Sequence, residues 1–465
     1  MNQEDKELKF YVSLIAGLSA FLTPFMSSSI NIALPAISKE FKMSPILISW
    51  VPTIFLLSSA SFLIPFGKIA DSYGKKRIFL LGIIIYTITS FFSCFSFSPF
   101  FFLIVRFLQG LGAAMIFSTA IALLSLFFPI GERGRALGIN VSATYFGLSS
   151  GPFLGGILTY YFNWRSIFIF NGIIGLIIIF LTILKLKIKE KEIKSIKFDY
   201  LGFILYSLTI ILIMLGFTFL PKLIGFLLIS ICFLLFFFFI IHQSKTIEPI
   251  LDIKLFKNNP VFTFSNLAAM INYSATFGIS FLLSLYLQYL RNFDSQKTGL
   301  ILISQPLTMA IFSPFMGMLS DRKEPRIIAS LGMALIAFSL FLLSFINKDL
   351  KIFFLIIWLF ILGFGFALFS SPNTNAVMSS VKKDFYGVAS ATLATMRMLG
   401  QMFSMGIIIS IFALVIGEAN FDKNNYFLLL KSIRIIFSIF AFLCFLGIFA
   451  SLKRGKMLKN GLKKL

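Results

Sequence analysis

The sequence GKIADSYGKKR, residues 67–77, places a carboxylate and several bases between two long apolar segments. Asp71 can accept hydrogen bonds from a helix N-terminus, or pair with a base of the next such loop, Arg133 or Arg135. Bonds of this kind can form in one state of a protein and break in another. A purely topology-setting role would explain the bases but not the spaced glycines and carboxylate. The residues that we predict to form a gating loop are Gly67, Asp71, Gly74, Lys75, Lys76 and Arg77.

A thinner copy of this loop, GMLSDRKEPR, occupies residues 317–326. It keeps Gly317, Asp321 and Arg322, but has Glu324 and Pro325 where the first copy has a glycine and a base. We therefore expect a second gating loop whose ionic contacts are weaker than those of the first. The recurrence of the loop indicates that the chain arose by duplication.

Two arginines lie well inside apolar segments. A charge at such a depth costs a few kcal/mol or more unless it faces water or polar partners. Arg106 has Gln109 beside it, with small residues continuing its helical face, so we expect it on a packed side, and Arg397 is the second buried base. Neutral amides add to these, each as consistent with a helix–helix hydrogen bond as with a solute contact. The amides that we predict to line a cavity are Asn31, Asn266, Asn272, Gln305, Asn373, Asn375 and Gln401.

The sequence lacks the residue clusters and motifs that hydrolytic catalysis, metal binding or ATP-driven transport would need. His242 is the sole histidine, the three cysteines are scattered through apolar segments, and no phosphate-binding G-x-x-x-x-G-K-[ST] loop occurs. We therefore expect neither an enzyme nor a bound cofactor or metal. The net charge of +23 is expected to meet phospholipid headgroups rather than nucleic acid.

The elements that must position these residues are membrane helices. The chain is 58% hydrophobic and 13% charged, and apolar runs of about 20 residues are long enough to cross a bilayer as helices. The fourteen spans that we predict are 11–33, 46–66, 78–98, 100–128, 137–161, 166–184, 200–220, 223–242, 261–290, 298–319, 327–346, 352–378, 387–416 and 428–452.

Loop charges predict the orientation. With the N-terminus inside, the inside segments hold 28 Lys and Arg and the outside loops hold 10. Because basic residues favour the cytoplasmic side, both termini are expected there. The place of the second loop copy predicts an all-α chain of 6+2+6 helices: an N-terminal bundle (1–184), a linker with an inserted hairpin (185–260) and a C-terminal bundle with a basic tail (261–465).

These motifs resemble the fourteen-span drug:proton antiporter family of the major facilitator superfamily. The first loop matches that superfamily's G-x-x-x-D-x-x-G-[RK]-[RK] signature, and RFLQGLGAA (106–114) and GLSSGPFLGG (147–156) resemble its fourth- and fifth-helix motifs. WRSIFIFNGIIG, FDYLG, EPILDIKLF and SPNTNAVMSSV are further matches. The resemblance implies the major facilitator fold, transport by alternating access, and a part for Arg106 in proton coupling.

Small residues recur every four positions in the fifth span, which lets helices pack backbone to backbone. A proline in the same face allows a bend. This seam suits either a rocking motion or static close packing, and the resemblance favours rocking. The residues of this motif are Gly147, Gly151, Pro152, Gly155 and Gly156.

The chain departs from the family in its first span, where Met26 replaces the usual aspartate. No carboxylate is predicted deep in the membrane, and guanidinium groups do not release their proton. Coupling would then use a rim carboxylate such as Asp71 or Asp199, or the chain is not an ordinary proton antiporter. We expect neutral or anionic lipophiles to be favoured over lipophilic cations.

The function that we predict is export of amphipathic, drug-like compounds across the cytoplasmic membrane by a monomer, driven by a gradient of protons or another ion. The alternative is a facilitator or exporter of one endogenous metabolite or lipid without proton coupling. An intramembrane enzyme or sensor would need a catalytic constellation that this sequence lacks.

Overall fold

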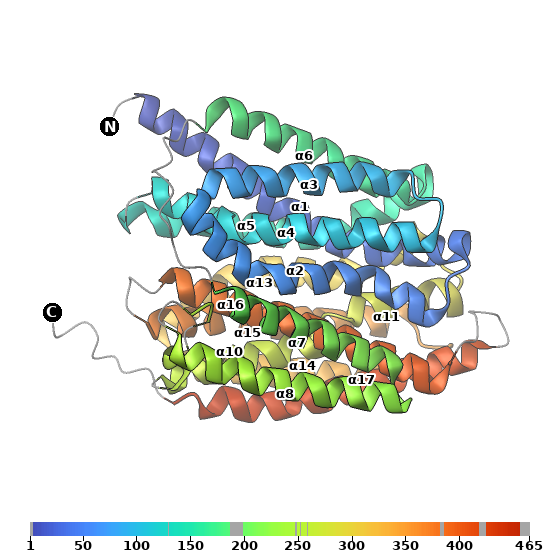
Figure 1. Cartoon of the computed structure of the whole chain (residues 1–465). Coiled ribbons are helices and arrows are strands. Elements are labelled where there is room, and N and C mark those ends of the chain that lie inside the picture. Colours follow the sequence, from blue (N-terminus) through green and yellow to red (C-terminus); the bar gives the residue numbers. More distant parts are fainter. Residues whose placement is uncertain are drawn as a thin grey trace. The chain divides into compact units, whose positions relative to one another are not determined.

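A computed structural model describes residues 3–128, 130–186, 199–246, 249–251, 253–257, 259–381, 386–417 and 425–455. Within these ranges every regular element is a helix (Figure 1). The earlier helices are α1 (Gln3–Phe41), α2 (Pro45–Tyr73), α3 (Lys75–Cys94), α4 (Pro99–Phe127), α5 (Ile130–Phe162), α6 (Arg165–Lys185), α7 (Tyr200–Phe219) and α8 (Leu223–Lys245). The later ones are α9 (Lys254–Lys257), α10 (Pro260–Thr276), α11 (Ile279–Leu285), the π-helical η1 (Tyr286–Leu290), α12 (Ser295–Leu302), α13 (Ser304–Arg322), α14 (Pro325–Leu343), α15 (Ile352–Ser379), α16 (Tyr386–Val415) and α17 (Tyr426–Lys453).

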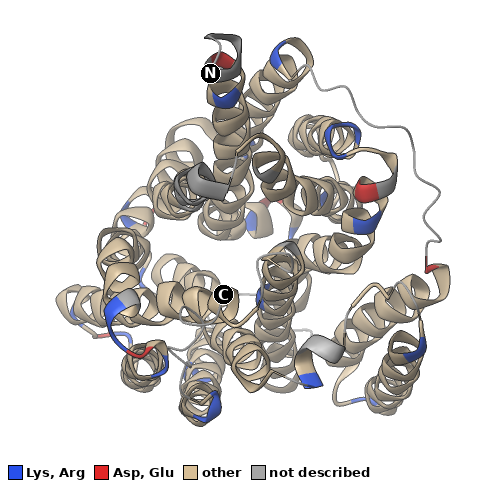
Figure 2. Cartoon of the chain, turned by 90° about the vertical axis from the view of Figure 1, so that its left-hand side faces the viewer, with Lys and Arg blue, Asp and Glu red and all other residues tan. Residues whose placement is uncertain are grey.

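The predicted all-α membrane fold with fourteen long helices is confirmed. In the described part, 13 helical segments are long and apolar enough to span a membrane; α10, α11 and η1 form one of them, and α12 with α13 forms another. The fourteenth long helix is α5. Figure 2 shows ribbons that are almost entirely uncharged, with charged turns near helix ends. Helices suit this setting because they pair their own backbone groups where water is absent.

The turn between α2 and α3 lies near the end of the predicted connection between the spans 46–66 and 78–98. The predicted span 46–66 ends directly before Gly67, and this boundary is wrong: α2 continues through Asp71 to Tyr73. The chain turns instead at Gly74, whose φ of 103° is a conformation that favours glycine. A Cβ on Gly67 would meet the Cβ of Ser118 at an ordinary 3.9 Å, so this glycine is not required by close backbone approach.

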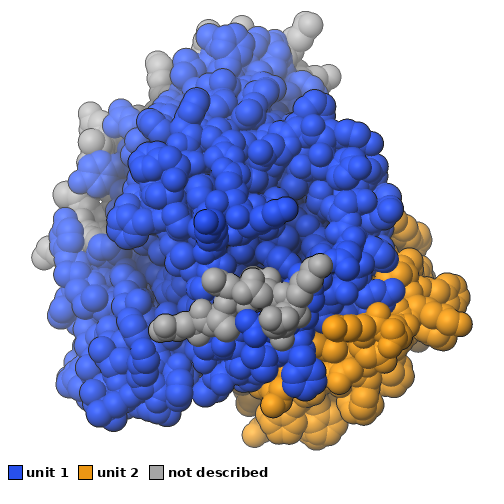
Figure 3. Space-filling model, turned by 90° about the vertical axis from the view of Figure 1, so that its right-hand side faces the viewer, with its two compact units in different colours: residues 1–250, 280–303, 406–429 blue, residues 251–279, 304–405, 430–465 orange. Residues whose placement is uncertain are grey.

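The helices group by contact into two compact units (Figure 3). Unit 1 contains residues 1–250, 280–303 and 406–429, and unit 2 contains residues 251–279, 304–405 and 430–465. Each unit combines segments that are far apart in the sequence, so the units do not coincide with the predicted bundles. The 6+2+6 division therefore stays a prediction.

Each unit contains the same close helix crossing. In unit 1, α3 meets α4 where a Cβ on Gly112 would lie 2.8 Å from the carbonyl oxygen of Gly82. In unit 2, α14 meets α15 where a Cβ on Gly332 would lie 2.6 Å from the carbonyl oxygen of Gly365. Such backbone approach is typical of membrane helices that pack through small residues. The crossings lie about 250 residues apart, as expected for a duplicated chain.

A second pair of crossings follows the same rule. A Cβ on Gly110 of α4 would lie 2.4 Å from the carbonyl oxygen of Phe55 of α2. In unit 2, a Cβ on Gly363 of α15 would lie 2.3 Å from the carbonyl oxygen of Gln305 of α13. The helices α2, α3 and α4 therefore correspond to α13, α14 and α15.

The α7–α8 hairpin attaches to unit 1 through one of its two helices. The Tyr206 hydroxyl of α7 donates to the carbonyl of Ala60 at 3.0 Å, and the Ser207 hydroxyl donates to the carbonyl of Ser61 at 3.2 Å. In the other helix, α8, only 17% of the residues in its apolar 18-residue stretch are buried. α8 therefore presents most of its surface to lipid.

The glycine crossings give a stability prediction. Gly112→Ala should lower the apparent Tm of the detergent-purified protein by several degrees, because the new methyl group overlaps backbone and such overpacking costs about 1–3 kcal/mol. Gly17→Ala is the matched control, since its Cβ would lie 3.9 Å from Ala143. Equal Tm values for the two variants would contradict the proposed tightness of the crossing.

Candidate functional site

Arg106 of α4 is enclosed by neutral groups from α2, α3 and α4. It is 1% exposed; its Nη1 donates to Gln109 Oε1, and its guanidinium lies 4.6 Å from the ring centroid of Phe55. Gln109 is held in turn, because its Nε2 donates to the Ser90 hydroxyl at 2.8 Å. The charge thus sits on a packed side of its helix, away from lipid.

This cluster can attract a partner but cannot carry a proton. Guanidinium has donors only and keeps its charge. A carbonyl or carboxylate of a solute could replace the Gln109 amide as the acceptor of Arg106, while an aromatic ring could stack near Phe55. Gln109 is therefore the residue that sets the orientation of Arg106 when no solute is bound.

Arg397 of α16 is the second predicted intramembrane charge; it belongs to unit 2 and does not lie at the position that corresponds to Arg106. Its Nη2 donates to the Thr374 hydroxyl of α15 at 2.7 Å, and its guanidinium lies 5.7 Å from the ring centroid of Tyr273 of α10. Its Nε is buried and has no hydrogen-bond partner among the described residues. Arg397 therefore retains donor capacity that a solute acceptor would fill.

The predicted cavity amides divide between the units. Asn31 is in unit 1, is 4% exposed, and has a buried Oδ1 with no hydrogen-bond partner in the described part. In unit 2, Asn373 donates to the carbonyl of Ser265 at 3.2 Å and has a similarly unpaired Oδ1. Gln305 and Gln401, also in unit 2, are half-buried. Convergence of both sets on one cavity stays a prediction.

Three further predicted amides belong to unit 2. Asn266 donates to the Phe262 carbonyl of its own helix, and Asn375 donates to the Ser320 hydroxyl at 3.0 Å. Asn272 is fully buried, and neither polar side-chain atom has a hydrogen-bond partner among the described residues. The unpaired amide of Asn272 is therefore more consistent with contact to a solute or a water molecule than with a hydrogen bond between helices.

The first gating loop forms a short ion pair in the structure. Asp71, at the end of α2, lies 3.4 Å from the Nζ of Lys75, at the start of α3, and its side chain is 55% exposed. Exposed pairs of this kind are worth about 0–1 kcal/mol, so this contact can be broken easily. The side chains of Arg133 and Arg135, its expected partners, lie outside the described residues, and so does that of Asp321.

The other gating residues lie at helix ends. Lys76 is half-buried and Arg77 is exposed in the first turn of α3. Gly317 and Arg322 lie in α13, Arg322 in its exposed last turn. A Cβ on Gly317 would lie 3.8 Å from the Cβ of Ser371, much as one on Gly67 would lie 3.9 Å from the Cβ of Ser118. The two loop copies thus occupy corresponding places.

The small-residue face of α5 packs mainly against α1. Cβ atoms on Gly147, Gly151 and Gly155 would lie 2.5–2.7 Å from Phe21, Ser28 and Ser29 atoms of α1. The hydroxyls of those two serines donate to the carbonyls of Leu148 and Gly151 at 2.9 and 3.0 Å. This face therefore fixes α5 to another helix of the N-terminal sequence.

A second face of α5 meets α12, from the later half of the sequence. A Cβ on Gly299 would lie 2.2 Å from the carbonyl oxygen of Pro152, and one on Gly156 would lie 2.6 Å from that of Ser295. The Ser295 hydroxyl also donates to the Gly156 carbonyl at 3.2 Å. All of these residues belong to unit 1. Pro152 and Gly156 therefore form a tight contact between earlier and later parts of the chain.

Asp199 was predicted as a rim carboxylate, and its bonds in the structure are already made. It caps α7 through the Gly202 amide at 2.8 Å, and it accepts hydrogen bonds at 2.7 Å from His242 and Gln243 of α8. Burial would raise the pKa of Asp199, but these three hydrogen bonds hold it below its ordinary value. Asp199 therefore joins the two helices of the hairpin.

One polar cluster, between α1 and α6, was not predicted from the sequence. Arg165 of α6 makes a bidentate pair with Glu40 of α1, with N–O distances of 2.7 and 2.9 Å, and Trp164 donates to the same carboxylate at 2.7 Å. Trp164 lies in a motif that the sequence displayed. Nothing in the sequence signalled Glu40 as its partner, because Glu40 near the end of α1 and Trp164 before α6 are separated by 124 residues.

The sequence model of the Major Facilitator Superfamily matches residues 16–405 and 265–458. The riboflavin transporter RibZ of Clostridioides difficile is 31% identical over 95% of this chain and 96% of its own length. The multidrug resistance protein Stp of Mycobacterium tuberculosis is 28% identical over 86% of this chain and 76% of its own length.

Solved structures show the same fold at low identity. An auto inhibited POT family peptide transporter aligns with a TM-score of 0.72 at 15% identity, covering 98% of both chains. A bacterial homologue of the human lysosomal transporter Spinster, crystallised inward-facing and unoccupied, aligns with a TM-score of 0.68 at 15% identity, covering 99% of this chain and 100% of its own.

The Arg106 cluster gives a second stability prediction. Gln109→Leu removes the acceptor of a buried guanidinium, and leaving such a donor unpaired costs about 1–3 kcal/mol or more. We expect a clear fall in the apparent Tm. Gln401→Leu is the matched control because Gln401 is only half-buried. A Gln109→Leu protein as stable as wild type would show that the cluster is not holding Arg106.

The hairpin cluster gives a pH prediction. Asp199→Asn should lower the apparent Tm at pH 7, because the lowered pKa of Asp199 means that its ionised form stabilises the fold. That advantage is complete above the ordinary pKa of 3.8 and is lost as the pH falls through the lower folded value. The Tm difference from wild type, measured between pH 3 and 7, should therefore shrink at the acid end.

A second aspartate cap provides the control for this series. Asp294 caps α12 through the Lys297 amide at 2.7 Å, without a histidine or glutamine on its carboxylate in the described structure. Asp294→Asn should lower the Tm less than Asp199→Asn. The reverse order would contradict the importance of the His242 and Gln243 bonds.

Proposed function

The chain belongs to the Major Facilitator Superfamily, and from that premise we propose that its solute is an uncharged or anionic aromatic compound, with riboflavin as the first candidate. The chain is a multi-pass membrane transporter and not an enzyme. We propose the identity of its solute, the way its transport is driven and its orientation in the membrane.

The polar groups available inside the helices support this choice. They are two guanidinium groups, on Arg106 and Arg397, and neutral amides. Every described Asp and Glu lies at a helix end or in a connection. A lipophilic cation would find no counter-charge here, whereas a flavin ring offers carbonyl acceptors for arginine and an aromatic face for Phe55 or Tyr273.

The relatives support two candidate solutes. RibZ, which aligns over nearly its whole length, is named for riboflavin, a neutral and largely planar molecule. Stp is named for multidrug resistance, which favours export of amphipathic drug-like compounds as the second candidate. The missing intramembrane carboxylate is the observation that ranks the flavin first.

The missing intramembrane carboxylate also bears on whether transport is coupled to protons. Asp71 is exposed and paired with Lys75, and Asp199 is held ionised by three hydrogen bonds. Neither suits a proton carrier that loads and unloads near neutral pH. We therefore propose that transport follows the solute gradient and is not driven by protons.

The gate and orientation complete the proposal. The tight α5–α12 contact at Pro152 and Gly299 would close one side of the transport path, and the Asp71 loop would act at the other, predicted cytoplasmic, side. Both termini are proposed to face the cytoplasm across the cytoplasmic membrane, from the loop charges. Fusion of a reporter to each terminus tests this, and termini on opposite faces would overturn it.

Reconstituted protein tests the solute and its coupling together. Liposomes with purified protein should take up riboflavin faster than empty liposomes, and an imposed pH gradient should change the rate by less than about twofold. Arg397→Leu should reduce the rate about tenfold or more, since a charge-assisted hydrogen bond is worth about 1.5–3 kcal/mol.

The control for this experiment is Arg434→Gln. Arg434 lies in the N-terminal part of α17 and donates to the Ile346 carbonyl at 2.7 Å. The variant therefore removes an arginine outside the proposed site. Uptake of ethidium without riboflavin uptake would overturn the proposed solute class. A rate that depends steeply on the pH gradient would overturn the proposed coupling.

A further inference from the structure

The residues that follow α6 and α17 are both buried, yet they have opposite chemistry. α6 packs on α3, and α17 contacts α14, which corresponds to α3, through the hydrogen bond between the hydroxyls of Ser330 and Ser451. Leu186 follows α6 directly and Arg454 follows α17 directly, and each is 1% exposed. The two side chains therefore close corresponding helix ends in the two halves.

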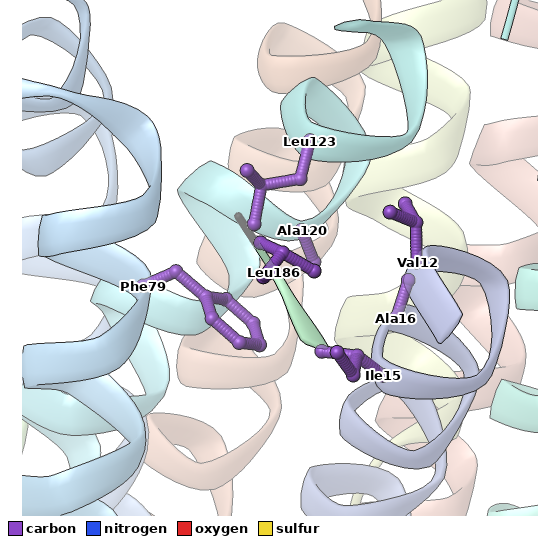
Figure 4. Close-up of a pocket in the computed structure, with 7 residues that line it drawn as sticks. All are labelled: Val12, Ile15, Ala16, Phe79, Ala120, Leu123 and Leu186. Carbon is purple, nitrogen blue, oxygen red and sulfur yellow. The ribbon is translucent and has the colours of Figure 1, made fainter. Parts of the chain in front are cut away.

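Leucine fills its place without any polar contact. Leu186 points into a small pocket that contains only apolar side chains (Figure 4). The other residues that line this pocket are Val12, Ile15, Ala16, Phe79, Ala120 and Leu123. The fold thus does not require a charged group at this place.

Arg454 enters its place with some of its donors satisfied. Its Nε donates to the Ser451 carbonyl at 2.8 Å and its Nη2 to the Ser451 hydroxyl. The Ser330 hydroxyl of α14 lies 2.8 Å from that of Ser451 and 2.6 Å from the carbonyl of Arg326. This chain of bonds links the end of α17 to the first turns of α14.

Two guanidinium donors remain unused there. Arg454 Nη1 and Arg326 Nε are buried and have no hydrogen-bond partner among the described residues. Burial lowers the pKa of Arg454 to about 10, which still leaves it charged at neutral pH. An unpaired buried charge of this kind is costly unless something supplies an acceptor.

The surrounding sequence offers mostly further positive charge. Arg454 is preceded by Lys453, and the residues after it, GKMLKNGLKKL, contain four lysines and no acid. Around the α13–α14 connection, Asp321 and Glu324 lie among Arg322, Lys323 and Arg326 in the sequence. No ion pair of Arg454 or Arg326 is recorded among the described side chains.

We propose that Arg454 and Arg326 bind a phosphate group, that of an anionic lipid headgroup, at the joined ends of α14 and α17. Phosphate oxygens accept the charge-assisted hydrogen bonds that guanidinium groups donate. Helix ends lie at the depth of the headgroups, and each base near an anionic membrane surface adds about 1 kcal/mol of attraction. A role confined to capping α17 would use Nε and Nη2 but leave Nη1 unexplained.

The first half of the chain supplies the test variant. Arg454→Leu places at this end the residue that α6 already has, so the variant is expected to fold. The full-length protein is purified in a neutral detergent, and its apparent Tm is measured with phosphatidylglycerol, with phosphatidylcholine and with sodium phosphate against sodium chloride of equal ionic strength. Lys453→Gln, an exposed neighbour with the same charge change, is the matched control.

We expect phosphatidylglycerol, and not phosphatidylcholine, to raise the Tm of wild type by several degrees, since a ligand that binds only the folded state stabilises it. Arg454→Leu should lose this rise, with an affinity for phosphatidylglycerol weaker by about tenfold or more, while Lys453→Gln keeps it. A rise with sodium phosphate alone would support the site and identify free phosphate as a sufficient ligand.

Two results would overturn the proposal: equal Tm values in the two lipids for wild type, or an unchanged phosphatidylglycerol response in Arg454→Leu. Should Arg454→Leu fail to fold, Arg326→Gln takes its place, with bound phosphatidylglycerol counted by native mass spectrometry. Retention of as much lipid as in wild type would then contradict the site.

Discussion

The structure depends on one constraint: a polar group inside the hydrocarbon must find its partner within the protein, because water is not available. The backbone meets this constraint as helices, and helices bring their backbones together where glycine leaves room, as at Gly82 and Gly112. Side chains meet it less completely. Arg106 is surrounded by Gln109, Phe55 and a backbone carbonyl, whereas Arg397 and Arg454 each retain a buried donor without a partner in the described structure.

The duplicated backbone makes these differences informative. The glycine crossings correspond, so Gly110 matches Gly363 and Arg106 matches Leu359, which is fully buried. Leu186 and Arg454 close corresponding helix ends. A fold that accepts leucine at one copy of a position has no structural need for arginine at the other. The asymmetry of charge within a symmetric backbone therefore marks the places where ligands, rather than packing, explain the residue.

The sequence predicted what depends on local pattern. Apolar runs predicted the helices, and the glycine spacing of residues 147–156 predicted a face for close packing. The predicted end of α2 at residue 66 is wrong, because Gly74, and not Gly67, is the residue whose positive φ turns the chain. Partners far apart in sequence could not be predicted: Glu40 with Arg165, and Asp199 with His242, meet only through the packing of α1 with α6 and of α7 with α8.

The fixed charges also limit how transport can be driven. A proton-coupled carrier needs a group whose charge changes between the two sides of the membrane, and guanidinium does not provide one. A solute that accepts hydrogen bonds from Arg397 can instead satisfy the donor that is unpaired without it, so binding itself lowers the cost of burying that charge. Under the proposed mechanism the solute is therefore the missing partner of the site, and the direction of net transport follows from the side on which that solute is more concentrated.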